Sequence, residues 1–162
     1  MIKSVDNAVP TVSIFPRARL HDSLMIGAPP GSLGLVNSPQ SSWITEPLFL
    51  KVLEHAKKHT RIFKGDHIIL LMDNHENYCT LDSILYAREN GIALVNFPPH
   101  CSHRLQTLDV GVMRPFTGKL RVAQHDWMTT NQGKMITVLH LALLTNAAYQ
   151  AFLLREYNSS FC

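Results

Sequence analysis

Two short apolar runs in the middle of the chain have the length and composition of buried strands. Residues 67–72 end at an aspartate, and residues 92–97 end at two prolines. Continuous apolar runs of this length are typical of strands that are covered on both faces in a parallel sheet. Residues 80–90 lie between them with the apolar spacing of a helix, and Gly91 occupies a position that commonly ends one. The pattern predicts a right-handed strand–helix–strand crossover.

The N-terminal quarter of the chain has a different pattern. Residues 9–15 alternate apolar and polar side chains, which predicts a strand, and Asp6-Asn7 before it is a turn signal that can close a hairpin. Prolines, glycines and serines then follow at close intervals from residue 16 to residue 42. This composition predicts a long irregular loop, and loops of that length in a compact domain tend to be functional or mobile.

Three further helices are predicted. The first has Thr45 as its cap and tolerates Pro47 in its first turn. A second begins at Pro115 and runs to about Thr130, and Thr137 can cap a last amphipathic one. The fold class is therefore α/β, or α+β if the hairpin makes up much of the sheet. The apolar face of the first of these helices consists of Leu48, Val52, Leu53 and Ala56.

Composition narrows the class of protein. With 162 residues, 46% of them apolar and 17% charged, the chain is long enough for one globular domain over 1–162. Three widely spaced cysteines predict no disulfide framework and a reducing compartment. No apolar run approaches the ~20 residues that span a bilayer, so we expect a soluble chain without a membrane partner.

The charge is mildly basic, at +3, with a pI near 8.9. It permits a nucleic-acid partner without requiring one. Arg114, Lys119 and Arg121 lie in one predicted helix and could follow a DNA backbone, but a solvated helix face explains them equally well.

Asp73 is the best candidate for chemistry. It comes directly after the first buried strand, with His75 two positions on, and ligand sites in open α/β sheets lie beyond the carboxyl ends of strands. A carboxylate there suits a divalent metal, although a turn or helix-cap aspartate fits the position as well. Asp109 follows the second strand and its loop. Two aspartates by themselves leave both interpretations open.

Nine histidines raise the question of a zinc site. The best pairs are His55 with His59 and Cys101 with His103, but neither is accompanied by the second half of a structural zinc site at a recognised spacing. We therefore expect no zinc, and we expect His55 and His59 to be surface residues of their helix.

The flanks of the two aspartates carry a resemblance. Residues 70–75 read Leu-Leu-Met-Asp-Asn-His, and residues 98–109 read Pro-Pro-His-Cys-Ser-His-Arg-Leu-Gln-Thr-Leu-Asp. In this order, with Asn-Gly-Ile-Ala-Leu at 90–94 between them, they resemble the DDE superfamily endonuclease domain of pogo/Tigger/Jerky-like transposases. Segments at 14–17, 27–32, 43–46, 127–128 and 148–161 are similar to further parts of that domain, so the resemblance covers nearly the whole chain.

The resemblance implies an RNase H-like core, a mixed sheet with flanking helices. It also implies three carboxylates that hold two Mg²⁺ (or Mn²⁺) ions for phosphodiester cleavage and strand transfer on DNA. Asp73 matches the family's second acid and Asp109 its third, so residues 67–109 would carry two of three catalytic acids. The resemblance further implies nuclear localisation. Possible DNA contacts are His75, His100, His103 and Arg104.

The sequence departs from the family pattern in one important respect. The family's first acid lies on an opening strand, and this chain starts after it, so we expect the first strand to be missing and the fragment to be inactive. Thr107 also replaces a usual proline. An uncovered strand edge would favour self-association. The alternative function is a domesticated, non-catalytic DNA- or protein-binding module.

Overall fold

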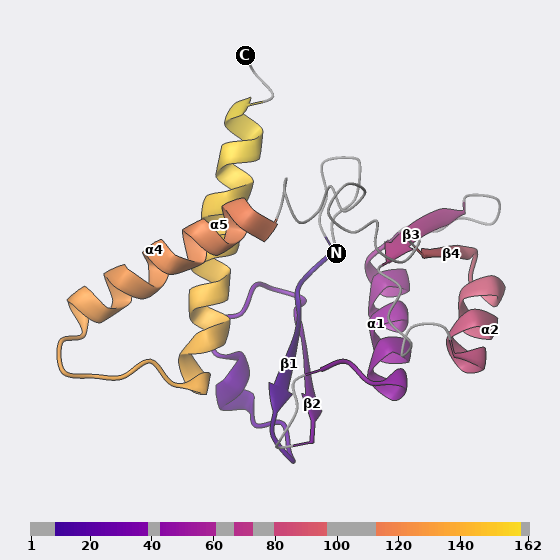
Figure 1. Ribbon diagram of the computed structural model, residues 1–162, viewed down its shortest axis with the longest axis horizontal. Helices are drawn as coiled ribbons and strands as arrows, with labels where there is room; N and C mark the ends of the chain where they lie inside the picture. The colour runs from indigo at the N-terminus through magenta and orange to yellow at the C-terminus, as the bar shows by residue number, and fades with distance from the viewer. Residues whose placement is uncertain (1–8, 39–42, 61–66, 73–79, 97–112, 160–162) are drawn as a thin grey trace. The chain divides into compact units, whose positions relative to one another are not determined.

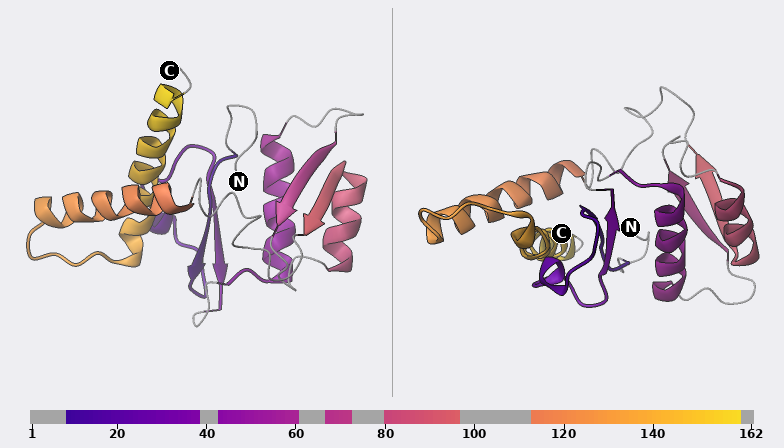
Figure 2. Two further views of the ribbon diagram at one scale, coloured as in Figure 1. Left: turned by 45° about the horizontal axis from the view of Figure 1, so that its top comes forward. Right: turned by 90° about the horizontal axis from the view of Figure 1, so that it is seen from below.

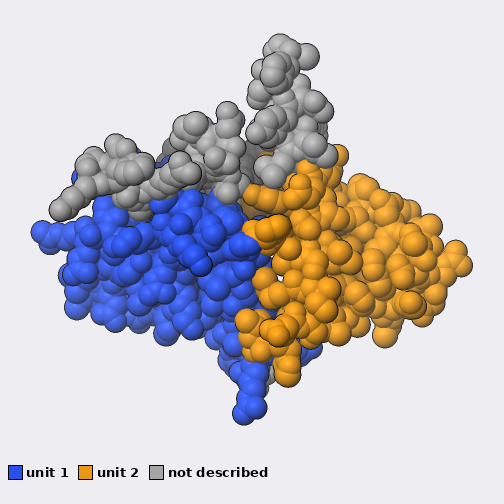
Figure 3. Space-filling view, turned by 180° about the vertical axis from the view of Figure 1, so that it is seen from behind, with its two compact units in different colours: residues 1–19, 31–105 blue, residues 20–30, 106–162 orange. Residues whose placement is uncertain are grey.

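The computed structural model describes residues 9–38, 43–60, 67–72, 80–96 and 113–159, with side chains to Phe152 (Figure 1). The chain divides into two compact units, coloured separately in Figure 3. Unit 1 comprises Met1–Arg19 and Gly31–Leu105, and unit 2 comprises Leu20–Pro30 and Gln106–Cys162. The class is mixed α/β, as predicted.

The predicted crossover is the centre of unit 1. β3 (Ile68–Met72) and β4 (Ile92–Asn96) pair in parallel, with Ile68 opposite Ile92 and Met72 opposite Asn96. α2 (Leu81–Glu89) connects them, as the sequence predicted. The Thr80 hydroxyl caps α2 by accepting a 3.4 Å hydrogen bond from the Ser83 backbone N–H.

α1 (Glu46–His59) and α2 cover the same face of β3 and β4, which is the lower face in Figure 1. Phe49 and Leu53 of α1 are buried against Met72 of β3. Further apolar side chains that pack against this core are Ile44, Val52, Leu70, Tyr86 and Leu94.

The opposite face of the two strands is open. Ile69 is 68% exposed, Leu71 49% and Val95 41%. The prediction of strands buried on both faces is therefore wrong for this pair. Successive side chains point to opposite faces of a strand, and both neighbouring helices lie on one of them. A continuous apolar run specifies that both faces can be covered, but it does not specify what covers each face.

The N-terminal strand has a partner that the sequence did not predict. β1 (Val12–Pro16) pairs in parallel with β2 (Leu33–Asn37), and Val12 lies opposite Leu33. The irregular loop expected over 16–42 thus contains β2 and a 3₁₀ turn, η1 (Asp22–Met25). The prolines, glycines and serines around β2 are typical of loops, so the composition did not predict a strand there. The turn expected at Asp6-Asn7 lies outside the described residues.

In the described part of the chain, β1–β2 and β3–β4 are separate two-stranded sheets. The RNase H-like strand order, with its missing first strand, stays a prediction.

His55 ties α1 to the segment before β1. Its side chain is only 7% exposed, and its Nε2 lies 3.0 Å from the Pro10 carbonyl oxygen. The His59 ring is tilted against it with centroids 4.6 Å apart. The prediction that His55 is a surface residue is therefore wrong. The polar ring is buried because it satisfies a backbone acceptor 45 positions away in sequence, which no local pattern reveals.

Unit 2 is mainly helical. α4 (Arg114–Thr130) matches the predicted helix and packs on α5 (Leu141–Ser159), which follows the short η4 (Val138–His140). The two crossing helices are visible from two further directions in Figure 2. Thr137 precedes η4, and its backbone N–H donates to His140 Nδ1 at 2.9 Å. Within Leu141–Phe152, the part of α5 whose side chains are described, the buried residues are Ala142, Leu144, Ala148 and Phe152. Across the ranges that are described, no helix has both the length and the hydrophobicity needed to cross a bilayer.

Gly27 is a position where unit 2 requires glycine. Its φ is +80°, and an added Cβ would lie 2.8 Å from Leu143 Cδ1 and 3.2 Å from the Leu143 Cα in α5. The loop after η1 thus lies so close to α5 that an added side chain would force Leu143 to shift. Gly133 has a similar φ of +78°, but nothing lies within 4 Å of its added Cβ.

These two glycines give a matched stability test. Gly27→Ala and Gly133→Ala both introduce a side chain at positive φ, which costs roughly 1–2 kcal/mol. Only Gly27→Ala also forces overpacking against Leu143, which adds about 1–3 kcal/mol. We expect urea unfolding to show the larger loss of stability for Gly27→Ala. Equal losses would contradict the close approach of this loop to α5.

Candidate functional site

β3 and β4 end at the same edge of their sheet. The strands are parallel and Met72 lies opposite Asn96, so their carboxyl ends are neighbours. Adjacent strands are about 4.8 Å apart. The chain leaves β3 directly into Asp73 and leaves β4 into the segment that contains Asp109. Two chain segments that carry the candidate acids therefore begin side by side.

The predicted site residues themselves lie outside the described residues. The proximity of the two aspartates stays a prediction, as do the possible DNA contacts. These residues are Asp73, His75, His100, His103, Arg104 and Asp109.

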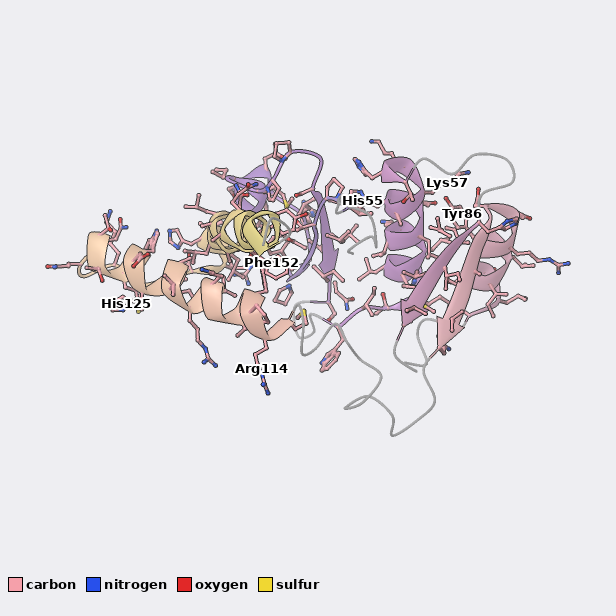
Figure 4. The ribbon with its side chains drawn as sticks, turned by 90° about the horizontal axis from the view of Figure 1, so that it is seen from above. His55, Lys57, Tyr86, Arg114, His125 and Phe152 are labelled. Carbon is pink, nitrogen blue, oxygen red and sulfur yellow. The ribbon has the colours of Figure 1, made fainter. Side chains whose placement is uncertain are left out.

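The end of β3 is firmly anchored. Met72 is 7% exposed and packs with Phe49 and Leu53 of α1, so the strand is fixed up to its last residue. Lys57 of α1 donates a hydrogen bond to the side chain of Asn90. Asn90 lies between α2 and β4, so this bond links α1 to the turn that leads into β4. Figure 4 shows Lys57 and Tyr86 in this unit. The position from which the Asp73 segment departs is thus set by a packed core.

Two tyrosines among the described residues have a raised pKa, and burial is the main cause for both. Burial, followed by the nearby Glu54 carboxylate, raises the pKa of the Tyr86 phenol. Burial also raises the pKa of Tyr149. Both phenols therefore remain protonated at neutral pH, and neither serves as a base there.

In the described part of the chain, no three His, Cys, Asp or Glu side chains are grouped closely enough to hold a metal ion. A hollow of about 590 Å³ lies along α2 and β4, and none of its described lining residues is a carboxylate. These residues therefore do not supply the ligands that Mg²⁺ prefers. Its lining consists of His67, Ile84, Ala87, Arg88, Gly91, Ile92, Ala93, Leu94 and Asn96.

The sequence matches the profile of the DDE superfamily endonucleases over residues 36–156, which is more than half of the chain. The chain belongs to this family. It is also 37% identical over 76 residues to the MFS-type transporter clz9 of Cochliobolus lunatus. That alignment covers 46% of this chain and 8% of the relative, so the chain spans less than a tenth of that protein's length. No solved structure matches the chain significantly.

Family membership confirms the resemblance seen in the sequence. It identifies a transposase-related nuclease family, in which divalent metals are typical and DNA is the implied substrate. The donor chemistry is compatible, because the two candidate acids supply the hard oxygen ligands that Mg²⁺ and Mn²⁺ prefer. The mixed α/β architecture is consistent with the family.

One group of residues was only partly recognised from the sequence. Arg114 and Arg121 were identified as basic residues of one helix, but Gly118 and His125 were missed. All four are exposed and lie at i, i+4, i+7 and i+11 along α4, hence on one helix face. Helical spacing applied to polar residues and glycine, rather than to apolar ones alone, would have found them.

If Asp73 and Asp109 share a metal, removing either one must remove the same site. We expect Asp73→Asn and Asp109→Asn each to weaken Mn²⁺ binding by more than about tenfold. The double variant should bind no worse than either single variant. Electron paramagnetic resonance of free Mn²⁺ during titration measures this directly. Asp126→Asn, an equal charge change at an exposed position of α4, is the control. Independent, additive losses would show that the two acids do not converge.

Proposed function

We propose that the chain is a DNA-binding, transposase-derived DDE endonuclease domain that carries two of the family's catalytic acids. The family match over 36–156 is the observation that carries this proposal. The parallel register of β3 and β4 supports it, since segments leading to both acids leave one sheet edge. The proposed architecture is an RNase H-like core, and the proposed location is the nucleus, where chromosomal DNA lies.

The proposed chemistry is metal-dependent phosphodiester cleavage and strand transfer. Asp73 and Asp109 are the residues that would hold divalent metal. When bound, paired ions activate the attacking oxygen and stabilise the leaving one. His75, His100, His103 and Arg104 would bind backbone phosphates and orient the strand.

The 162 residues include matches to the second and third acids of the family but not to the first. A two-metal site depends on carboxylates that bridge or flank both ions, so two acids alone position the pair poorly. We therefore propose that this chain by itself is inactive.

The purified 162-residue chain should not cleave supercoiled DNA in the presence of Mg²⁺ or Mn²⁺, because the metal site is incomplete. The measurement is the conversion of plasmid to nicked and linear forms, with Asp73→Ala and Asp126→Ala compared in parallel. Robust nicking that Asp73→Ala abolishes and Asp126→Ala preserves would refute the proposed inactivity.

A second candidate function is a non-catalytic protein-binding module. The open face formed by Ile69, Leu71 and Val95 favours it, because exposed clustered apolar side chains mark interaction surfaces. In the described part of the chain β3 also pairs with β4 alone, so its other edge offers unpaired backbone groups. We propose self-association through β3 as the simplest use of this surface.

Lysine on β3 tests this association, because charged side chains discourage edge pairing. We expect Leu71→Lys to shift the chain toward monomer in sedimentation velocity at a given concentration. Leu139→Lys is matched in exposure, at 48% against 49% for Leu71, and should leave the distribution unchanged. A wild-type chain that is monomeric at all concentrations would rule the association out.

A further inference from the structure

One face of α4 is basic, exposed and centred on a glycine. Arg114, Gly118, Arg121 and His125 form this face, which we call the basic face. Figure 4 shows the Arg114 and His125 side chains on the side of α4 away from α5. The other side of the helix packs on α5, and half-buried apolar side chains on it include Phe116, Leu120, Ala123 and Trp127.

The fold does not explain Gly118. A glycine inside a helix destabilises it relative to alanine, because the unfolded chain loses more freedom on folding. Gly118 has no positive φ, and an added Cβ would meet nothing within 4 Å. No neighbour within the described residues therefore demands a missing side chain here. What the glycine provides is a point where an outside molecule can approach the helix backbone.

The charge of Arg114 also opposes the stability of the helix. Arg114 lies in the first turn, which contains no acidic residue, although the positive end of the helix dipole favours acids there. No side chain caps the first turn at Met113. Within the described ranges neither Arg114 nor Arg121 has an ion-pair partner. The arrangement is unfavourable for the isolated helix and favourable for binding an anion.

We infer that the basic face of α4 binds the phosphate backbone of double-stranded DNA, with Gly118 admitting the strand between the two arginines. Arg114 and Arg121 are about 10.5 Å apart along the helix axis, at 1.5 Å per residue. That separation corresponds to about three base-pair steps of 3.4 Å. The inference rests on the proposed function, because the family makes DNA the implied substrate. Contacts of this kind position the protein without reading the sequence.

A second copy of the chain fits this face less well. A two-fold symmetric contact through it would place the arginines of one copy near those of the other, and the face holds no acid to offset them. Asp126 is the single acidic residue of α4, and it lies about 120° around the helix from Arg114, at 100° per residue. Charge complementarity therefore favours a polyanion.

The test is the affinity of the full 162-residue chain for a short mixed-sequence DNA duplex, followed by fluorescence anisotropy between about 50 and 200 mM salt. We expect Arg114→Ala combined with Arg121→Ala to weaken binding by about an order of magnitude at the lower salt and to reduce the salt slope by about 2. Lys51→Ala combined with Lys58→Ala removes the same charge from exposed positions of α1 and should change the affinity little.

Gly118→Leu separates binding from folding. Leucine is a better helix former than glycine and has open space at this position, so the thermal midpoint should rise while DNA affinity falls. Gly118→Ala should raise the midpoint with a smaller loss of affinity.

The outcomes distinguish the inference from the proposed function. A wild-type chain that does not bind DNA overturns both. If the wild type binds but the α4 variants bind equally well, or if the α1 control weakens binding as much, the inference fails and DNA binding stands. If Gly118→Leu instead dissolves an oligomer without affecting DNA affinity, a second copy occupies the face.

Discussion

The packing of Met72 against Phe49 and Leu53 is the contact on which unit 1 depends. It joins the last residue of β3 to the middle of α1 and closes the core from which the crossover is built. Because β4 pairs with β3 in register, the same contact also fixes where β4 ends. The segments that carry Asp73 and Asp109 therefore depart from an anchored edge, and a metal site placed there would have a rigid support.

A consequence of this packing is an asymmetric sheet. α1 and α2 both lie on the Met72 side, so Ile69, Leu71 and Val95 remain exposed on the other. In the described part of the chain β3 pairs with β4 alone, and exposed apolar side chains beside an unpaired strand edge favour association. The proposed metal site and the proposed association surface would therefore both rest on these two strands.

Unit 2 contains two glycines whose surroundings differ. Gly27 is required because the loop after η1 reaches the backbone of α5, whereas Gly118 has open space around it and weakens α4 without a packing reason. A glycine that the fold requires and one that the fold does not require look the same in a sequence. Their surroundings distinguish a structural role from a role in contact with another molecule.

The sequence alone determined the strand–helix–strand unit, the main helices and the family, but not β2 or η1. The apolar runs before Asp73 and Pro98, with Gly91 between them, specify the strand–helix–strand unit, because periodicity and helix-ending signals act between near neighbours in the chain. The motifs around both aspartates identified the DDE endonucleases in the same way. Only the tertiary structure decided the pairing of β1 with β2, the burial of His55 on the Pro10 carbonyl and the uncovered face of β3. Each of these depends on which distant segment supplies a partner. A local pattern shows that a strand or a polar group needs a partner, but it does not identify the segment that provides one.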